Sequence, residues 1–355
     1  MFRLIRHGHN PFLNFGKTQN TGFSPRHHRL RSYTTMKDTS KSVGSKPPRP
    51  KGPGDAARTE RRAIAKSTLE IIEAGHYTID GVKHDIRPRL ESMLSGTRYY
   101  APDSLLSLWP KPTSAGNFAR ERATEISIVE ISTLEGAGFL ASTPYTSREE
   151  TRRRVGVLNF ASAKHPGGGF QSGAQAQEES IARSSTLYPS LVCSTGEKFY
   201  DIHNKDSKGG YYSHAMIFSP DVVVFRTDSG KLVEPTQIEV ATSAAVNAGV
   251  ARKTLNGQVA GEAEEVKIGK VMKERMGRIL FLFEKHGIKD LVLGSFGTGV
   301  FQNKVSLVAA IWAELLVAPN ARFANSFDRV VFAILGSPTI VEFKGAFEER
   351  QTAKR

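Results

Sequence analysis

The stretch VGVLNFASAKHPGGGFQSGAQAQEE, residues 155–179, joins a buried strand, a glycine cluster and two carboxylates. The nearly continuous apolar run 155–160 is typical of a central strand in a parallel sheet. Three adjacent glycines at 167–169 lose much backbone entropy on folding, and such runs occur where a backbone approaches a ligand closely. Glu178 and Glu179 follow within one loop length. We therefore predict a ligand cradle beside an acid pair, a layout suited to chemistry on a phosphorylated sugar.

The pattern of apolar residues along the chain predicts an α/β fold. Helices are expected at 56–74, 260–286 and 306–316, and Gly75 is a typical residue to end the first of them. Strands are expected at 125–132, 155–160, 221–225, 237–244, 291–294 and 329–335. Strands that alternate with helices favour a sandwich in which much of the sheet is parallel.

A second glycine-rich loop, GSFGTGVFQN at 294–303, begins where the expected strand 291–294 ends. Ligands of open α/β sheets bind at the carboxyl ends of strands, so both glycine loops are expected at one site. Its glycines allow backbone N–H groups to converge on phosphate oxygens. The dinucleotide pattern G-x-G-x-x-G fails because Gln302 stands where the third glycine belongs, and no G-x-x-x-x-G-K-[ST] occurs. The loops therefore disfavour a dehydrogenase and a P-loop NTPase.

The sequence has no pattern of metal ligands. Its single cysteine is Cys193, and its ten histidines are scattered without an H-E-x-x-H motif. We expect neither a metal nor an organic cofactor. No apolar run approaches the roughly 20 residues that span a bilayer, so no membrane partner is expected.

The net charge of +14 is concentrated at the N-terminus. Residues 1–54 carry 11 Lys and Arg against Asp38 alone, which leaves +4 for residues 55–355. Residues 1–37 lack Asp and Glu and mix arginines with Phe, Leu and Ile, which predicts a mitochondrial transit peptide. A disordered basic tail is the alternative, and a start at Met36 would yield a nuclear or cytoplasmic form. Residues 38–54 predict a flexible basic linker, and we expect no specific nucleic-acid partner.

Four segments together resemble the microbial-type poly(ADP-ribose) glycohydrolases, which are built on a macrodomain. These segments are VLNFASAKHPGGG (157–169), GAQAQEESIARSS (173–185), FSPDVVVF (218–225) and GSFGTGVFQN (294–303). Seven residues separate Gly169 from Gln177, which fits the family signature GGG-x(6–8)-QEE. The resemblance covers about residues 55–345 and implies a macrodomain-like three-layer α/β/α sandwich with a mixed central sheet. It also implies an N-terminal helical extension at 55–124, a catalytic domain at 125–345 and a C-terminal tail at 346–355.

The resemblance assigns roles to particular residues. Glu179 matches the catalytic acid of the family, and Glu178 matches the partner that holds the ribose hydroxyls. The substrate-binding positions that it implies are Gly167, Gly168, Gly169, Gln177, Gly297, Thr298, Gly299, Val300, Phe301 and Asn159. Ser162 and Asn247 are weaker candidates for the same pocket. Thr298 departs from the family, since many relatives carry Cys or Asn there, and residues 244–247 lack a Pro that relatives often carry.

The implied substrate is poly(ADP-ribose) on modified proteins, and the implied product is ADP-ribose. Adjacent carboxylates partly buried against glycine backbone and Phe301 should raise the pKa of one of them by repulsion and desolvation. We expect Glu179 to protonate the leaving ribose oxygen and then to activate the attacking water. The resemblance also implies a monomer and a place in the DNA damage response. Three alternatives stay open: a reader that binds ADP-ribose without hydrolysis, a hydrolase of single ADP-ribose marks, and a nucleic-acid binder that depends on residues 1–54.

Overall fold

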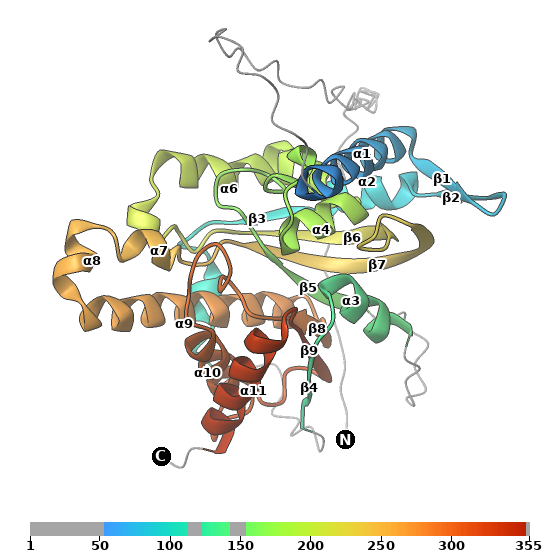
Figure 1. Cartoon of the computed structure of the whole chain (residues 1–355). Coiled ribbons are helices and arrows are strands. Elements are labelled where there is room, and N and C mark those ends of the chain that lie inside the picture. The colour runs from blue at the N-terminus through green and yellow to red at the C-terminus, as the bar shows by residue number, and fades with distance from the viewer. Residues whose placement is uncertain (1–52, 112–122, 143–153, 353–355) are drawn as a thin grey trace, which may run out of the picture. The chain divides into compact units, whose positions relative to one another are not determined.

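A mixed seven-stranded sheet with helices on both faces forms the centre of the protein (Figure 1). The computed structural model describes residues 53–111, 123–142 and 154–352, which belong to one compact unit. The predicted transit peptide 1–37 lies outside the described residues, as does the predicted linker up to residue 52. The last two residues of that linker, Pro53 and Gly54, already belong to helix α1, Pro53–Ala74.

The strands of the sheet follow the order β3-β6-β7-β5-β8-β9-β4. Their bounds are β3 Arg98–Tyr100, β4 Glu125–Val129, β5 Val155–Phe160, β6 Met216–Arg226, β7 Leu232–Ser243, β8 Asp290–Leu293 and β9 Arg329–Ala333. The five strands from β7 to β4 run parallel, whereas β6 is antiparallel to both of its neighbours. The prediction of a largely parallel sheet in an α/β fold is therefore confirmed.

Helices cover both faces of the sheet (Figure 1). One layer consists of α1, α2 Arg87–Gly96, α3 Thr133–Ser142, α4 Gln177–Ser184, α5 Leu187–Val192 and α6 Ser194–Lys205. The other consists of α9 Glu262–Lys285, α10 Val305–Leu316 and α11 Ser337–Thr352. Two short helices, α7 Ala248–Ala251 and α8 Leu255–Ala260, connect β7 to α9. This is the three-layer sandwich with a mixed sheet that the resemblance implied.

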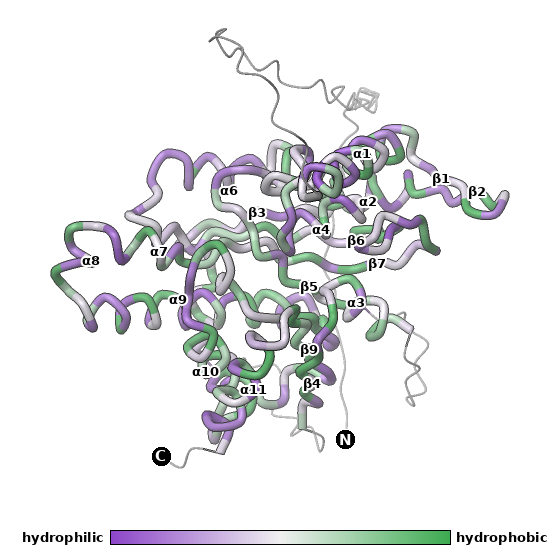
Figure 2. The backbone as a smooth tube through the Cα atoms, in the orientation of Figure 1, coloured by the Kyte–Doolittle hydropathy of each residue, from purple (hydrophilic) through white to green (hydrophobic). Residues whose placement is uncertain are grey.

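Two hydrophobic cores lie on opposite faces of the sheet because successive strand residues point to opposite faces. In β8, Leu291 and Leu293 pack with the α9–α11 layer, whereas Val292 between them packs with the α1–α6 layer. In β9, Val330 packs with the α9–α11 layer and Val331 packs with the α1–α6 layer. Figure 2 shows the resulting hydrophobic colour along the central strands and α10, while α6 on the surface is mostly hydrophilic. Packing in these two cores fixes the ends of the strands from which the loops of the site begin.

The N-terminal segment 55–124 is more than the helical extension that was expected. It also supplies the hairpin of β1 His76–Ile79 with β2 Val82–Asp85, and it supplies β3, which pairs with β6 at the edge of the central sheet. Tyr99 packs with one core and Tyr100 with the other. A strand of three residues is too short for an alternating pattern to reveal it, which is why the sequence did not predict β3.

Other element boundaries differ from the predictions for local reasons. β6 begins at Met216, five residues before the expected start, because Pro220 and Asp221 interrupt the apolar pattern at an irregularity in the pairing with β7. Gly261, at φ 54°, separates α8 from α9, so the expected helix 260–286 begins at Glu262. At the other end of the chain, α11 continues to Thr352 and buries Phe347, so packed structure extends past residue 345, where a tail was expected. In the described part of the chain, no helix combines the length and apolar character that crossing a membrane requires.

Candidate active site

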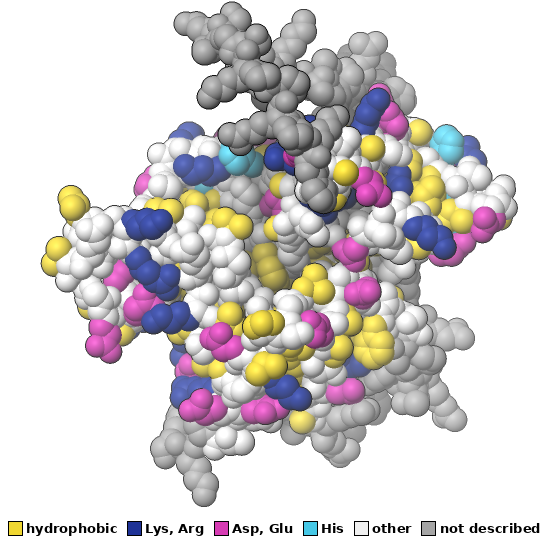
Figure 3. All heavy atoms as spheres, in the orientation of Figure 1, with side chains coloured by type: hydrophobic (Ala, Val, Ile, Leu, Met, Phe, Trp, Pro, Cys, Tyr) yellow, Lys and Arg dark blue, Asp and Glu magenta, His cyan; other side chains and the backbone are white. Residues whose placement is uncertain are grey.

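The loops that follow β5 and β8 meet over one large cavity at the carboxyl ends of these parallel strands. Residues of both loops, the start of α4 and one side of α1 line the cavity, whose volume is about 1560 Å³. The space-filling view shows this face of the molecule hollowed between the upper helical layer and the lower one (Figure 3). The volume exceeds the roughly 300–1,000 Å³ of a pocket for one drug-sized ligand. The cavity is therefore large enough for an extended ligand.

The glycine run allows the backbone of the first loop to touch the acid pair. Gly167 and Gly168 have φ values of 68° and 58°, in the left-handed region that favours glycine. A Cβ added to Gly168 would lie 2.3 Å from Oε1 of Glu179 and 3.2 Å from Oε2 of Glu178. The next N–H, from Gly169, donates to Glu179 Oε1 at 2.9 Å. The run thus positions the carboxylates, a role that the sequence interpretation did not assign to it.

Glu178 lies in the floor of the cavity with only 3% of its surface exposed. Its Oε2 accepts the Ser162 N–H at 2.7 Å, and its Oε1 accepts from Asn159 Nδ2 at 3.3 Å. Burial raises the pKa of the Glu178 carboxyl to about 8, with a smaller contribution from the nearby charge of Glu179. The group therefore holds a proton near neutral pH. The expectation that one of the two acids has a raised pKa applies to Glu178.

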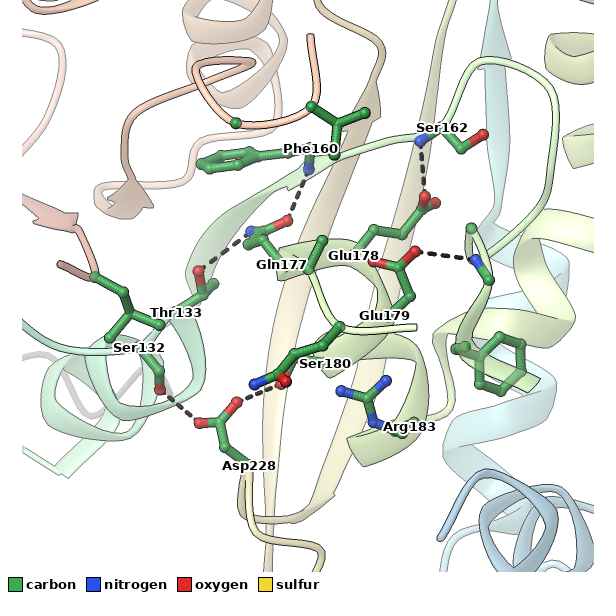
Figure 4. Close-up of a pocket in the computed structure, with 18 of the residues that line it drawn as sticks. Ser132, Thr133, Phe160, Ser162, Gln177, Glu178, Glu179, Ser180, Arg183 and Asp228 are labelled. Carbon is green, nitrogen blue, oxygen red and sulfur yellow. Dashed lines mark hydrogen bonds between the residues drawn. The ribbon is translucent and has the colours of Figure 1, made fainter. Parts of the chain in front are cut away.

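Glu179 lies half-buried on the cavity wall at the start of α4 (Figure 4). The Gly169 N–H holds one of its carboxylate oxygens, while the rest of the group faces the cavity. An acid in the first turn also interacts favourably with the helix dipole. The arrangement is not that of a solvated helix start, since Glu178 beside it is buried and both carboxylates face the glycine loop.

Gln177 fixes the start of α4 to the end of β5 (Figure 4). Its Oε1 accepts the Phe160 N–H at 2.8 Å, and its Nε2 donates to the Leu158 carbonyl at 2.7 Å and to the Thr133 hydroxyl at 3.2 Å. All three contacts are to protein groups. Gln177 lines the cavity, but its amide is already used to position the two acids that follow it.

The conformation of the second loop is fixed by a buried asparagine. Asn303, 3% exposed, donates from Nδ2 to the carbonyls of Val246 at 2.7 Å and Gly297 at 2.9 Å. Gly297 has φ 76°, and a Cβ there would lie 2.3 Å from Ala245 Cβ. The Thr298 hydroxyl donates to a carbonyl of its own loop, so this side chain is engaged within the loop.

Comparisons with known proteins agree with this geometry. The family model described as microbial-type PARG, catalytic domain, matches residues 65–227. The poly(ADP-ribose) glycohydrolase of Thermomonospora curvata is 38% identical, with 82% of this chain and 99% of that chain covered and a TM-score of 0.70. The same enzyme bound to the inhibitor ADP-HPD matches with a TM-score of 0.68. The chain belongs to the microbial-type poly(ADP-ribose) glycohydrolases.

A second solved member of the family comes from Deinococcus radiodurans. This glycohydrolase, in complex with ADP-ribose, is 30% identical, with 74% of this chain and 98% of that chain covered and a TM-score of 0.61. A search of the curated proteins found no match.

In this member of the glycohydrolase family, most of the predicted site residues line this cavity. These are Gly168, Gly169, Gln177, Glu178, Glu179, Gly297, Thr298, Gly299, Val300 and Phe301, with Ser162 beside them. Phe301 packs against Tyr212 at 5.8 Å between ring centroids, and Val300 is 82% exposed. Asn159 contacts Glu178 and does not line the cavity. Gly167 does not line the cavity either, and its left-handed backbone forms the turn before Gly168. Asn247 accepts from the Val250 N–H at the start of α7, away from the cavity wall.

Two residues of the site in this glycohydrolase, Asp228 and Arg183, were not predicted from the sequence. Asp228, in the turn after β6, accepts hydrogen bonds from the hydroxyls of Ser180 and Ser132, which ties α4 to the segment before α3 (Figure 4). No local signal could have found it, because Ser132 precedes it by 96 residues. Arg183 also lines the cavity, and its spacing of four from Glu179 places both on one helix face. In the described residues, no cluster of His, Cys, Asp and Glu has the arrangement of a metal site.

Proposed function

We propose that this glycohydrolase cleaves the ribose–ribose O-glycosidic bond of poly(ADP-ribose) with Glu179 as general acid and then general base. The family assignment supports the substrate and the reaction, since related enzymes were crystallised with ADP-ribose and with ADP-HPD. The observation that carries the residue assignment is the pair of adjacent carboxylates in unlike environments. Glu178 is buried and held on both oxygens, whereas Glu179 is held on one oxygen and faces the cavity.

The reaction begins with proton donation from Glu179. As the bond between the anomeric carbon and the leaving ribose oxygen breaks, the oxygen keeps the electron pair and takes the proton, and an oxocarbenium-like sugar forms. The substrate fills the cavity and excludes water, so the proton passes directly from the Glu179 carboxyl to the leaving oxygen. The carboxylate left behind then takes a proton from the water that attacks the sugar cation. General acid–base help of this kind contributes roughly 10²–10⁴-fold.

Glu178 acts as a neutral, positioned partner. Because it holds a proton near pH 7, it adds no negative charge beside Glu179, and it offers a hydrogen bond to a ribose hydroxyl. Its attachment to Ser162 N and Asn159 fixes the end of β5 against α4. The glycine loops at 167–169 and 297–299 are suited to the diphosphate, because their backbone N–H groups lie on the cavity wall or beside it.

A direct assay separates this enzyme from a reader of ADP-ribose. The wild-type chain is incubated with poly(ADP-ribosyl)ated protein, and free ADP-ribose is measured by chromatography. A glycohydrolase releases ADP-ribose with repeated turnover. Tight binding of ADP-ribose without release would identify a reader and contradict the proposal.

We also propose that residues 1–37 direct the protein to mitochondria. Support comes from the sequence alone, in the absence of acids and the mixture of arginine with apolar residues. A fluorescent protein fused after residue 54 should enter mitochondria, and a fusion that starts at Met36 should remain in the cytoplasm and nucleus. Equal distribution of the two fusions would contradict the proposal.

A further inference from the structure

The cavity continues past the acid pair to a wall that carries two arginines. Arg61 of α1 and Arg183 of α4 line this part of the cavity together with Tyr188 and Gln175. Figure 4 shows Arg183 one turn along α4 from Glu179, on the opposite side of the acids from Phe160. The glycine loop 297–299 also lines the cavity, and Phe296, which directly precedes this loop, packs against Phe160 at 5.6 Å between ring centroids. The acids thus stand between the side of the second glycine loop and the side of the two arginines.

Neither arginine is neutralised by an ion pair. Across the described residues, no carboxylate lies within 4.0 Å of the Arg61 or Arg183 guanidinium, although Glu179 and Asp228 act on Arg183 from farther away. Those two carboxylates accept hydrogen bonds from other groups. Arg183 is only 4% exposed, and burial, followed by repulsion from Arg61, lowers its pKa. Glu60 and Asp228 also line the cavity, but among the described residues neither forms an ion pair with Arg61 or Arg183. The two mutually repelling guanidinium groups therefore remain available to an anion.

The polymer supplies an anion on that side of the scissile bond. If the terminal ADP-ribose unit places its diphosphate on the glycine loops and its anomeric carbon at Glu179, the leaving oxygen belongs to the adenosine ribose of the preceding unit. That preceding unit carries a diphosphate of its own, and it leaves on the far side of the acid. The cavity volume, about 1560 Å³, also exceeds what one drug-sized ligand needs.

We propose that Arg61 and Arg183 bind the diphosphate of the ADP-ribose unit that precedes the scissile bond. This inference rests on the proposed function and adds to it a second subsite for the polymer. The enzyme then holds two successive units, one on each side of Glu179. Charge-assisted contacts to phosphate are about twice as strong as neutral hydrogen bonds, so the preceding unit should add measurably to recognition.

The same arginines also support the loop between the glycine run and the acids. Arg61 Nε donates to the Gly173 carbonyl at 2.8 Å, and Arg183 Nη1 donates to the Ala174 carbonyl at 2.6 Å. Arg62, the next residue of α1, donates from Nε to the Ser172 carbonyl at 2.9 Å, but it does not line the cavity. Arg62 is therefore a matched control: its loss removes a loop contact without removing a charge from the cavity.

The test compares two substrates that differ on the leaving side. One is poly(ADP-ribose), and the other is ADP-ribose with an uncharged fluorogenic phenol at the anomeric carbon, which has no preceding diphosphate. The ratio of kcat/KM on the polymer to kcat/KM on the phenol glycoside is measured for wild type, Arg61→Gln, Arg61→Lys and Arg62→Gln. We expect Arg61→Gln to lower the ratio about tenfold, Arg61→Lys to restore part of it and Arg62→Gln to leave it within twofold. Added salt should lower the wild-type ratio more than that of Arg61→Gln.

An equal loss on both substrates in Arg61→Gln, or the same fall in ratio for Arg62→Gln, would reduce Arg61 to a support of the loop and overturn the subsite. An unchanged ratio in Arg61→Gln would overturn it as well. If the wild-type chain cleaves neither substrate, the glycohydrolase proposal itself fails and the subsite falls with it.

Discussion

The protonated state of Glu178 makes stability depend on pH in a way that one substitution isolates. In the unfolded chain this carboxyl titrates near its ordinary value of 4.5, and in the folded protein its pKa is about 8. Below pH 4.5 both states hold the proton. As the pH rises, the unfolded state ionises while the folded state keeps its proton, so stability is progressively lost until the pH reaches about 8.

The magnitude follows from the interval between these two pKa values. At 1.36 kcal/mol per pH unit, the interval from 4.5 to about 8 corresponds to about 5 kcal/mol. Water in the open cavity near Glu179 offsets part of the desolvation, so we expect about 2–5 kcal/mol. Glu178→Gln removes the titration. A glutamine still accepts from the Ser162 N–H, and after rotation of the Asn159 amide it can donate to Asn159 Oδ1, which has no partner among the described residues.

Wild type and Glu178→Gln are unfolded with urea at several pH values between 4.5 and 8.5, and unfolding is monitored by tryptophan fluorescence. In the difference between the unfolding free energies of the two proteins, the titration of groups that both share cancels. Such groups include His203 and His214, whose pKa values burial lowers to about 4 and about 3. We expect the stability of wild type relative to the variant to fall steadily from pH 4.5 to 8 and then to level off. A difference that does not change with pH would mean that Glu178 is ionised in the folded protein and would refute the reasoning.

Two further substitutions probe the loops. Gly168→Ala should cost about 1–2 kcal/mol of unfolding free energy for its left-handed backbone and lower turnover at least tenfold, because the new Cβ displaces Glu179. The control is Gly345→Ala in α11, which does not line the cavity and has nothing within 4 Å of its added Cβ, so it should keep near wild-type turnover. Equal turnover of the two variants would contradict this. Asn303→Ala removes the two donations that hold the second loop, so calorimetry should show ADP-ribose affinity about tenfold weaker; unchanged affinity would mean that the loop keeps its shape without this side chain.

The sequence predicted the parts of the site that are continuous in the chain. The run from Val155 to Glu179 contains a strand, a left-handed turn and a helix start, and each has a local signature. The sequence did not show which of the two acids has the raised pKa, because burial raises the pKa of Glu178 and burial depends on packing. Ser162 and Asn159 contact Glu178 only because β5 lies against α4.

The parts that sequence reasoning missed are contacts between distant residues. Arg61 reaches the Gly173 carbonyl across 112 residues, and Asn303 reaches the Val246 carbonyl across 57. Nothing in the local pattern of α1 distinguishes Arg61 from its exposed neighbour Arg62. The edge strand β3 was missed for a related reason, since its pairing partner β6 lies more than 100 residues away.

The most direct test of the mechanism is to measure Glu179→Gln for binding and turnover together. Calorimetry gives its affinity for ADP-ribose, and chromatography gives its release of ADP-ribose from poly(ADP-ribosyl)ated protein. We predict affinity within a few-fold of wild type and turnover at least a hundredfold lower, because the variant keeps the pocket and loses the proton donor. Turnover within a few-fold of wild type, with affinity retained, would show that Glu179 is not the acid.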